Sequence, residues 1–133
     1  MLFIGAILIG VAIIVMVSRR MPDELVPWGS DYSAALVTAR KTNKPILLYF
    51  TASWCGPCQE MRRYVWGEPR VADAIKAYVP VRIDVDAQPQ FAEQYKADQG
   101  IPLFVVVDAQ GNELRRIVGA MPADDFLNWV VRK

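Results

Sequence analysis

The sequence predicts an α/β fold in which a central mixed sheet of about four strands carries helices on both faces. Four short apolar or alternating segments have the character of strands and are interleaved with segments of helical periodicity. The last two of these strands are separated by a turn-forming stretch typical of a hairpin. Strands that alternate with helices and end in a hairpin favour a sheet between two helical layers. A chain of 133 residues suits one such domain plus an appendage.

The N-terminus is the appendage. The first seventeen residues carry no charged side chain, and Ser18, Arg19 and Arg20 follow. As a helix this run spans about 25 Å, a little short of the ~30 Å hydrocarbon core of a bilayer, and the two arginines could reach the interface. We expect an N-terminal transmembrane helix over residues 1–18. A cleaved signal peptide and a buried core helix are the alternatives, although the run has no basic segment before it and is apolar on every face.

Residues 19–30 are predicted to be a linker because this stretch contains prolines and a glycine. The globular domain then spans residues 31–133. Its first helix can be capped by Ser30 or Asp31 and is stopped by Pro45. The continuous apolar run that follows predicts a strand buried on both faces. In chain order the expected elements are helix 31–43, strand 46–50, helices 56–66 and 70–78, strand 81–85, helix 91–96, strands 103–107 and 113–118, and a last helix opened by Pro122.

Charge and composition exclude several classes of function. The chain carries 15 Lys plus Arg against 14 Asp plus Glu, and a net charge of +1 gives no electrostatic reason to expect a nucleic-acid partner. It has no histidine, which excludes Ser-His-Asp and Cys-His catalytic sites and histidine-ligated zinc. Chemistry in this chain must therefore use cysteine, carboxylate, lysine or backbone groups.

Both cysteines lie in one short stretch, Cys55-Gly-Pro-Cys58, where a predicted buried strand ends and a helix begins. A sulfur at that place faces unpaired backbone N–H groups and the positive end of the helix dipole. We therefore expect the pKa of the Cys55 thiol to fall below the ~8.5 of a free cysteine. Cys58, inside the first turn, should be more shielded. One reactive and one resolving thiol can exchange disulfides through a mixed intermediate.

A zinc clip and a structural staple are the competing interpretations of the two cysteines. A zinc site needs about four protein ligands, so these two sulfurs would serve only in a site shared across a dimer. A disulfide that closes so short a loop removes little chain entropy and contributes little stability. We therefore expect a redox-active disulfide, with no metal and no separate cofactor.

The stretch Phe-Thr-Ala-Ser-Trp-Cys-Gly-Pro-Cys, with Gly-Ile-Pro at 100–102, resembles the thioredoxin superfamily over roughly residues 31–133. Asn-Lys-Pro at 43–45 and the run 64–71 resemble, more narrowly, the thioredoxin-like domains of membrane-bound thiol-disulfide interchange proteins. The resemblance implies a thioredoxin-like fold and the activity of a protein thiol-disulfide oxidoreductase. Its expected partners are protein thiols and disulfides and a further redox protein.

The resemblance also assigns roles to residues. Cys55 would be the attacking nucleophile and Cys58 the resolving thiol. Pro102 matches the family's cis-proline, which packs against the disulfide, and the backbone of Ile101 would pair with a bound substrate strand. Only about 5–6% of X-Pro bonds in folded proteins are cis, so the cis expectation depends on the resemblance. The residues that would shape the motif are Trp54, Gly56 and Pro57.

Two positions depart from the family pattern. Thioredoxins usually have a buried aspartate six residues before the first cysteine, which accepts the resolving thiol's proton, and Tyr49 stands there instead. A tyrosine, with a pKa near ~10, is a poor base at neutral pH. Arg82 replaces the lysine that pairs with that aspartate, and Glu60 lies about 200° round the helix from Cys58, so we expect it to be solvated. Deprotonation of Cys58 is therefore expected to be slow or to depend on water.

The expected function is a membrane-anchored oxidoreductase that reduces protein disulfides or relays electrons. A disulfide oxidase or isomerase is one alternative, and a non-catalytic thioredoxin-fold binding module is another. The arginines at 19–20 favour a cytoplasmic domain, whereas the family resemblance favours an extracytoplasmic one. We expect the extracytoplasmic side.

Overall fold

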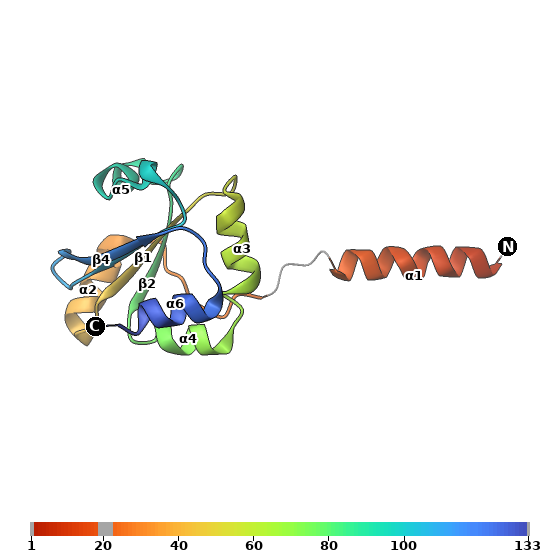
Figure 1. Cartoon of the computed structure of the whole chain (residues 1–133), viewed down its shortest axis with the longest axis horizontal. Helices are drawn as coiled ribbons and strands as arrows, with labels where there is room; N and C mark the ends of the chain where they lie inside the picture. The colour runs from red at the N-terminus through yellow and green to blue at the C-terminus, as the bar shows by residue number, and fades with distance from the viewer. Residues whose placement is uncertain (1, 19–22, 133) are drawn as a thin grey trace.

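The structure is a computed structural model that describes residues 2–18 and 23–132 (Figure 1). Its centre is a sheet of four strands in the order β2-β1-β3-β4. β1 pairs in parallel with β2 and antiparallel with β3, and β3 pairs antiparallel with β4, so the sheet is mixed. The predicted four-stranded mixed sheet is therefore confirmed. The strands are β1 (Ile46–Thr51), β2 (Val79–Asp84), β3 (Leu103–Val107) and β4 (Glu113–Val118).

Helices cover both faces of this sheet (Figure 1). On one face, α2 and the segment around α5 pack on apolar side chains of the strands, with Tyr32 and Tyr95 buried between them. On the other face, α3, α4 and α6 enclose an aromatic cluster in which Trp66, Phe104 and Phe126 are fully buried. The helices are α2 (Tyr32–Thr42), α3 (Gly56–Tyr64), α4 (Pro69–Ile75), α5 (Pro89–Gln94), the 3₁₀ turn η1 (Ala97–Gln99) and α6 (Ala123–Val130).

The burial of each strand follows its place in the sheet. β1 and β3 are the two central strands, and every residue of β3 and all but the last of β1 are buried. Each has a helical layer on both faces, which is why their sequences are continuously apolar. β4 lies at the sheet edge and exposes alternate residues. The strand that leads into the Cys55-Cys58 stretch, β1, therefore lies in the buried centre of the sheet.

Helix α1 (Leu2–Ser18) confirms that the apolar N-terminal run is helical. Its described apolar side chains, from Phe3 to Met16, are exposed. The expectation of a transmembrane helix is nevertheless wrong: in the parts of the chain that the structure describes, no helix combines the length and apolarity needed to cross a bilayer. The physical reason is length, because 17 residues at ~1.5 Å per residue fall short of a ~30 Å hydrocarbon core. Arg19 and Arg20, which were expected to extend the span, lie outside the described residues.

The described part of the predicted linker, residues 23–30, lies along the domain. The backbone N–H of Leu25 donates to the carbonyl of Trp66 at 2.9 Å, and Val26 is buried. Gly29 extends the sheet beyond β2, since its N–H donates to Pro80 at 3.0 Å and its carbonyl accepts from Arg82 at 2.8 Å. This segment is therefore attached along the outer edge of β2.

Candidate functional site

Cys55 and Cys58 form a disulfide at the junction of β1 and α3. Cys55 is the N-cap of α3, with extended backbone dihedrals, and its Sγ accepts the backbone N–H of Cys58 at 3.2 Å. The side chain thus occupies the position where a helix presents unpaired N–H groups. Both cysteines are almost completely buried and pack with Ala52 against Val85 and Ile101.

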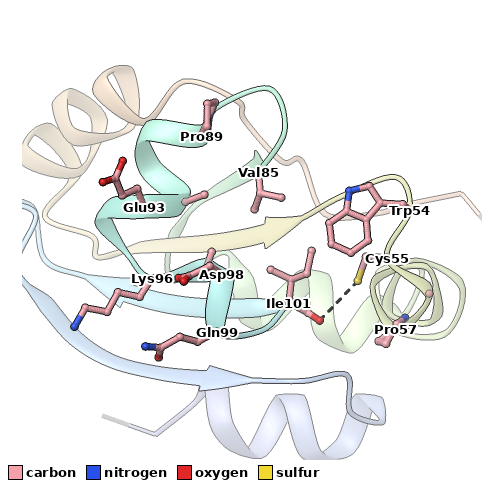
Figure 2. A pocket seen from close by; sticks show the side chains of 13 residues that line it. Trp54, Cys55, Pro57, Val85, Pro89, Glu93, Lys96, Asp98, Gln99 and Ile101 are labelled. Carbon is pink, nitrogen blue, oxygen red and sulfur yellow. Dashed lines mark hydrogen bonds between the residues drawn. The ribbon is translucent and has the colours of Figure 1, made fainter.

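The loop before β3 brings a second backbone segment to the disulfide. The peptide bond between Ile101 and Pro102 is cis, as the resemblance predicted. The carbonyl oxygen of Ile101 lies 3.7 Å from Sγ of Cys55 (Figure 2). In the reduced protein the Cys55 thiol lies within reach to donate to this oxygen. Gly100, just before this pair, has a φ of 152° and lets the loop approach Val118.

The three residues predicted to shape the motif all adjoin the disulfide. Pro57 lies in the first turn of α3, where its missing N–H leaves no helix hydrogen bond unmade. Trp54 is exposed, and its indole Nε1 donates to a carboxylate oxygen of Asp86 at 2.8 Å. An added Cβ at Gly56 would contact nothing within 4 Å, so this residue leaves the approach to the disulfide open.

A large cavity of about 910 Å³ opens on one side of the disulfide. Figure 2 shows that Trp54 and Pro57 lie on one side of it and the α5–η1 segment, with Glu93 and Lys96, on the other. Cys55 lines this cavity together with Ile101, whereas Cys58 does not. The structure therefore brings five of the predicted site residues to one cavity: Trp54, Cys55, Gly56, Pro57 and Ile101.

A smaller cavity of about 200 Å³ lies on the other side, and Cys58 lines it while Cys55 does not. Its other charged walls are Glu24 from the segment before α2, Arg62 from α3, and Arg82 and Asp84 from β2. The two cysteines therefore line different spaces: Cys55 the large cavity, and Cys58 the smaller cavity with its charged side chains. This asymmetry distinguishes the two cysteines chemically.

Glu24 contacts both arginines that line the smaller cavity. One carboxylate oxygen, Oε2, accepts a hydrogen bond from Nη2 of Arg82, and the other, Oε1, lies 3.3 Å from Nε of Arg62. The Glu24 side chain is only 18% exposed. The Arg82 guanidinium also lies over the rings of Trp28 and Tyr49, at 5.6 and 5.9 Å from their centroids. Arg82 is thus held in place by a carboxylate from the predicted linker, an arrangement that the sequence analysis missed.

Tyr49 also lines the smaller cavity, next to Cys58. Burial raises the pKa of its phenol above the ordinary value of 10.0, and this outweighs the nearby Arg82 charge that favours the ionised form. Its hydroxyl donates to the backbone carbonyl of Cys58 at 3.4 Å. Tyr49 is therefore a neutral donor at physiological pH, as expected of a poor base. Glu60 is exposed, also as expected.

The described residues contain no group of three or more His, Cys, Asp or Glu side chains placed to hold a metal ion. The site consists of the Cys55–Cys58 disulfide between the large cavity and the smaller, charged one. Of the residues that surround it, Glu24 and Asp86 could not be found from the sequence, because no spacing rule connects either with the two cysteines.

Comparison with known protein families gives one match, to a family described as a thioredoxin-like domain, over residues 32–132. Among individual proteins, the thiol:disulfide interchange protein DsbD of Vibrio vulnificus is 37% identical over 102 residues, which are 73% of this chain and 17% of that protein. The chain therefore spans about a sixth of the length of that relative. A thioredoxin H-type of Fagopyrum esculentum is 39% identical over 100 residues, 75% of this chain and 81% of that protein.

The solved structures that resemble this chain include a thioredoxin and the C-terminal domain of a DsbD. A thioredoxin from Thermus thermophilus superposes with a TM-score of 0.68 at 27% identity and covers 79% of this chain and 84% of its own. The oxidised C-terminal domain of Neisseria meningitidis DsbD has a TM-score of 0.62 at 33% identity and covers 77% and 95% of the two chains. The reduced form of that domain has a TM-score of 0.61.

Proposed function

This chain belongs to the thioredoxin-like domain family, and from that premise we propose that it is a thiol-disulfide oxidoreductase that reduces protein disulfides or relays electrons through Cys55 and Cys58. The matched segment covers nearly the whole of the domain, from residue 32 to residue 132. Relatives that this segment resembles include a thiol:disulfide interchange protein and a thioredoxin H-type. The dithiol itself is the redox group, so the reaction needs no separate cofactor.

The observation that carries the proposal is the asymmetry of the two sulfurs. Cys55 lines the large cavity, in which a protein segment can approach, whereas Cys58 lines the small pocket behind it. Cys55 is therefore the sulfur that attacks a substrate disulfide. Cys58 then attacks Cys55 in the resulting mixed disulfide, releases the substrate as a dithiol and leaves the protein oxidised.

The start of α3 supports Cys55 as the nucleophile. Its Sγ accepts the N–H of Cys58, and the helix dipole also favours negative charge at that position. Both effects stabilise the thiolate, which is the reactive species in exchange. The dipole effect weakens within the first turn, so Cys58 gains less from it.

Ile101 and Pro102 are proposed to bind the substrate chain. The Ile101 carbonyl lies beside Cys55 in the wall of the large cavity, where a substrate strand that brings its disulfide to Cys55 would run. Trp54, Gly56 and Pro57 also line this cavity. Backbone pairing of this kind is independent of side-chain sequence, which suits an enzyme acting on different proteins.

The experiment that tests the proposal is a trapping assay with a disulfide-bonded model protein. Cys58→Ser keeps the attacking thiol and removes the resolving one, so it should accumulate a covalent mixed disulfide with the substrate. Cys55→Ser is the matched control and should trap almost none, because the remaining thiol is shielded. Equal trapping by both variants, or reversible non-covalent binding that survives Cys55→Ser, would contradict the proposed chemistry and favour a binding module.

Placement of the domain outside the cytoplasm stays a prediction of the sequence.

A further inference from the structure

We propose that Glu24, from the segment before α2, accepts the proton of the Cys58 thiol during resolution of the mixed disulfide. This inference rests on the proposed function and names the group that replaces the aspartate missing at Tyr49. The first argument is position. Glu24 and Cys58 line the same cavity of about 200 Å³, which is polar and large enough to admit a water between them.

The second argument compares Glu24 with the other titratable side chains of this cavity. Tyr49 donates its hydroxyl to the Cys58 carbonyl, and its phenol stays protonated. Asp84 also lines the cavity, but its Oδ1 accepts the backbone N–H groups of Asp86 and Ala87 at 2.9 and 3.3 Å and so caps the turn after β2. The remaining titratable side chains of the wall, Arg62 and Arg82, are cationic donors.

The third argument concerns the two carboxylate oxygens of Glu24. Oε2 is occupied by Arg82, which fixes the orientation of the group. Oε1 is buried and accepts no hydrogen bond from the part of the chain that the structure describes, although Nε of Arg62 lies 3.3 Å away. One oxygen therefore anchors the carboxylate, and the other keeps lone pairs with which to accept a proton.

Resolution of the mixed disulfide moves one proton and one electron pair. In the mixed disulfide, Sγ of Cys55 is bonded to a substrate sulfur. The Cys58 thiol gives its proton through water to Oε1 of Glu24, and its sulfur attacks Sγ of Cys55. The bond between Cys55 and the substrate breaks, and the substrate sulfur leaves with the electron pair as a thiolate that takes a proton from solvent. Glu24 then returns its proton to solvent, and the two electrons of the dithiol have passed to the substrate.

The attachment of residues 23–30 explains how a residue so distant in sequence can serve this role. Backbone hydrogen bonds of Leu25 and Gly29, which both follow Glu24 in the chain, tie the segment to the domain. Val26 is buried between them. Glu24 thus directly precedes an attached stretch of chain, and Arg82 reaches it from β2.

The test measures resolution directly in the full chain. Reduced protein reacts with dithiobis(nitrobenzoate): attack by Cys55 releases one thionitrobenzoate, and attack by Cys58 releases the second. In the wild type we expect the second phase to have a nearly constant rate from pH 6 to 8, because a base within the protein takes the proton as the Cys58 thiol attacks. In Glu24→Gln that rate should fall about tenfold per pH unit below the pKa of a thiol near ~8.5, since only preformed thiolate then attacks. At pH 7 the second phase of the variant should be at least about tenfold slower than that of the wild type. General bases typically contribute ~10²–10⁴-fold, so this loss lies at or below the low end of that range.

Controls separate a proton acceptor from a structural role. Asp84→Asn removes the other carboxylate of the cavity and should keep the flat dependence of the second-phase rate on pH. Glu24→Asp retains a carboxylate at position 24, so its pH dependence should be less steep than that of Glu24→Gln. A flat profile in Glu24→Gln, an equal loss at every pH, or a steep profile in Asp84→Asn would each overturn the inference. A steep pH dependence in the wild type would also overturn the inference, and this measurement does not depend on the folding of any variant. If the first phase and the trapping of a protein by Cys58→Ser persist in any of these cases, the proposed function stands while the role of Glu24 fails.

Discussion

Replacement of Gly100 by alanine should destabilise the domain and disturb the site. Gly100 has a φ of 152°, which L side chains rarely adopt, and an added Cβ would lie 2.9 Å from Cγ1 of Val118. The unfavourable backbone conformation costs about 1–3 kcal/mol, and the clash adds about 1 kcal/mol because a β-branched valine has few rotamers to escape into. We therefore expect the free energy of unfolding to fall by about 3 kcal/mol.

The assay is urea denaturation followed by tryptophan fluorescence, with two further variants. Gly56→Ala is the matched control, because its added Cβ meets nothing within 4 Å, and it should leave stability unchanged or slightly raised. Val118→Ala in the Gly100→Ala background should recover about 1 kcal/mol, the clash alone. A loss below about 0.5 kcal/mol for Gly100→Ala, or full recovery in the double variant, would refute the reasoning that backbone conformation dominates.

Three other predictions address the aromatic core, the pH dependence of stability and the smaller cavity beside Cys58. Phe126→Ala should lower the free energy of unfolding by about 3–5 kcal/mol in urea titrations, because this fully buried ring packs edge-on against two aromatic neighbours. Hydrogen bonds from Asn112 hold the pKa of the Asp108 carboxyl below its ordinary value of 3.8, so its contribution to stability should be complete above about pH 4 and lost as pH falls through the native pKa; an NMR titration midpoint at or above 3.8 would contradict this. Tyr49→Phe should leave the resolution rate unchanged to within about twofold, because the phenol bonds the Cys58 carbonyl and not its sulfur, and a large loss in the thionitrobenzoate assay would show that the hydroxyl takes part.

Much of the fold was predictable because local and tertiary signals agree. The structure confirms the predicted strands β1 and β3 and the hairpin before β4. Of the two candidate caps, Ser30 and Asp31, the structure has Asp31. The family resemblance is confirmed as well. Helix starts were less accurate: α4 and α5 begin at Pro69 and Pro89, one and two residues earlier than predicted. Proline fits the first turn of a helix, and the prediction did not use Pro69 and Pro89 in this way.

The first thirty residues were the least predictable part of the chain. Apolarity alone favoured a transmembrane helix over residues 1–18, but the length of α1 does not support it. The segment that follows looked like a linker because it contains prolines and a glycine, and composition does not reveal backbone pairing with β2. Glu24 was missed for the same reason. Its only sequence signal was an arginine at position 82 that lacked its usual acidic partner.

The cysteine site was predictable in its chemistry but not in its asymmetry. The spacing placed Cys55 at a helix start, and the structure makes it the N-cap whose sulfur accepts a backbone N–H. That Cys55 and Cys58 line separate cavities depends on the packing of α5, η1 and residues 23–30, which come from distant parts of the chain. Such long-range placement is outside the reach of local patterns.

The most direct test of the central claim is the reduction potential of the Cys55–Cys58 pair, titrated in dithiothreitol and glutathione buffers. We expect a reversible two-electron transition near the ~−270 mV of thioredoxin, as a protein reductant requires. A midpoint near the ~−120 mV of a strong oxidant would instead make the protein a disulfide donor. A pair that does not titrate would contradict the redox function itself.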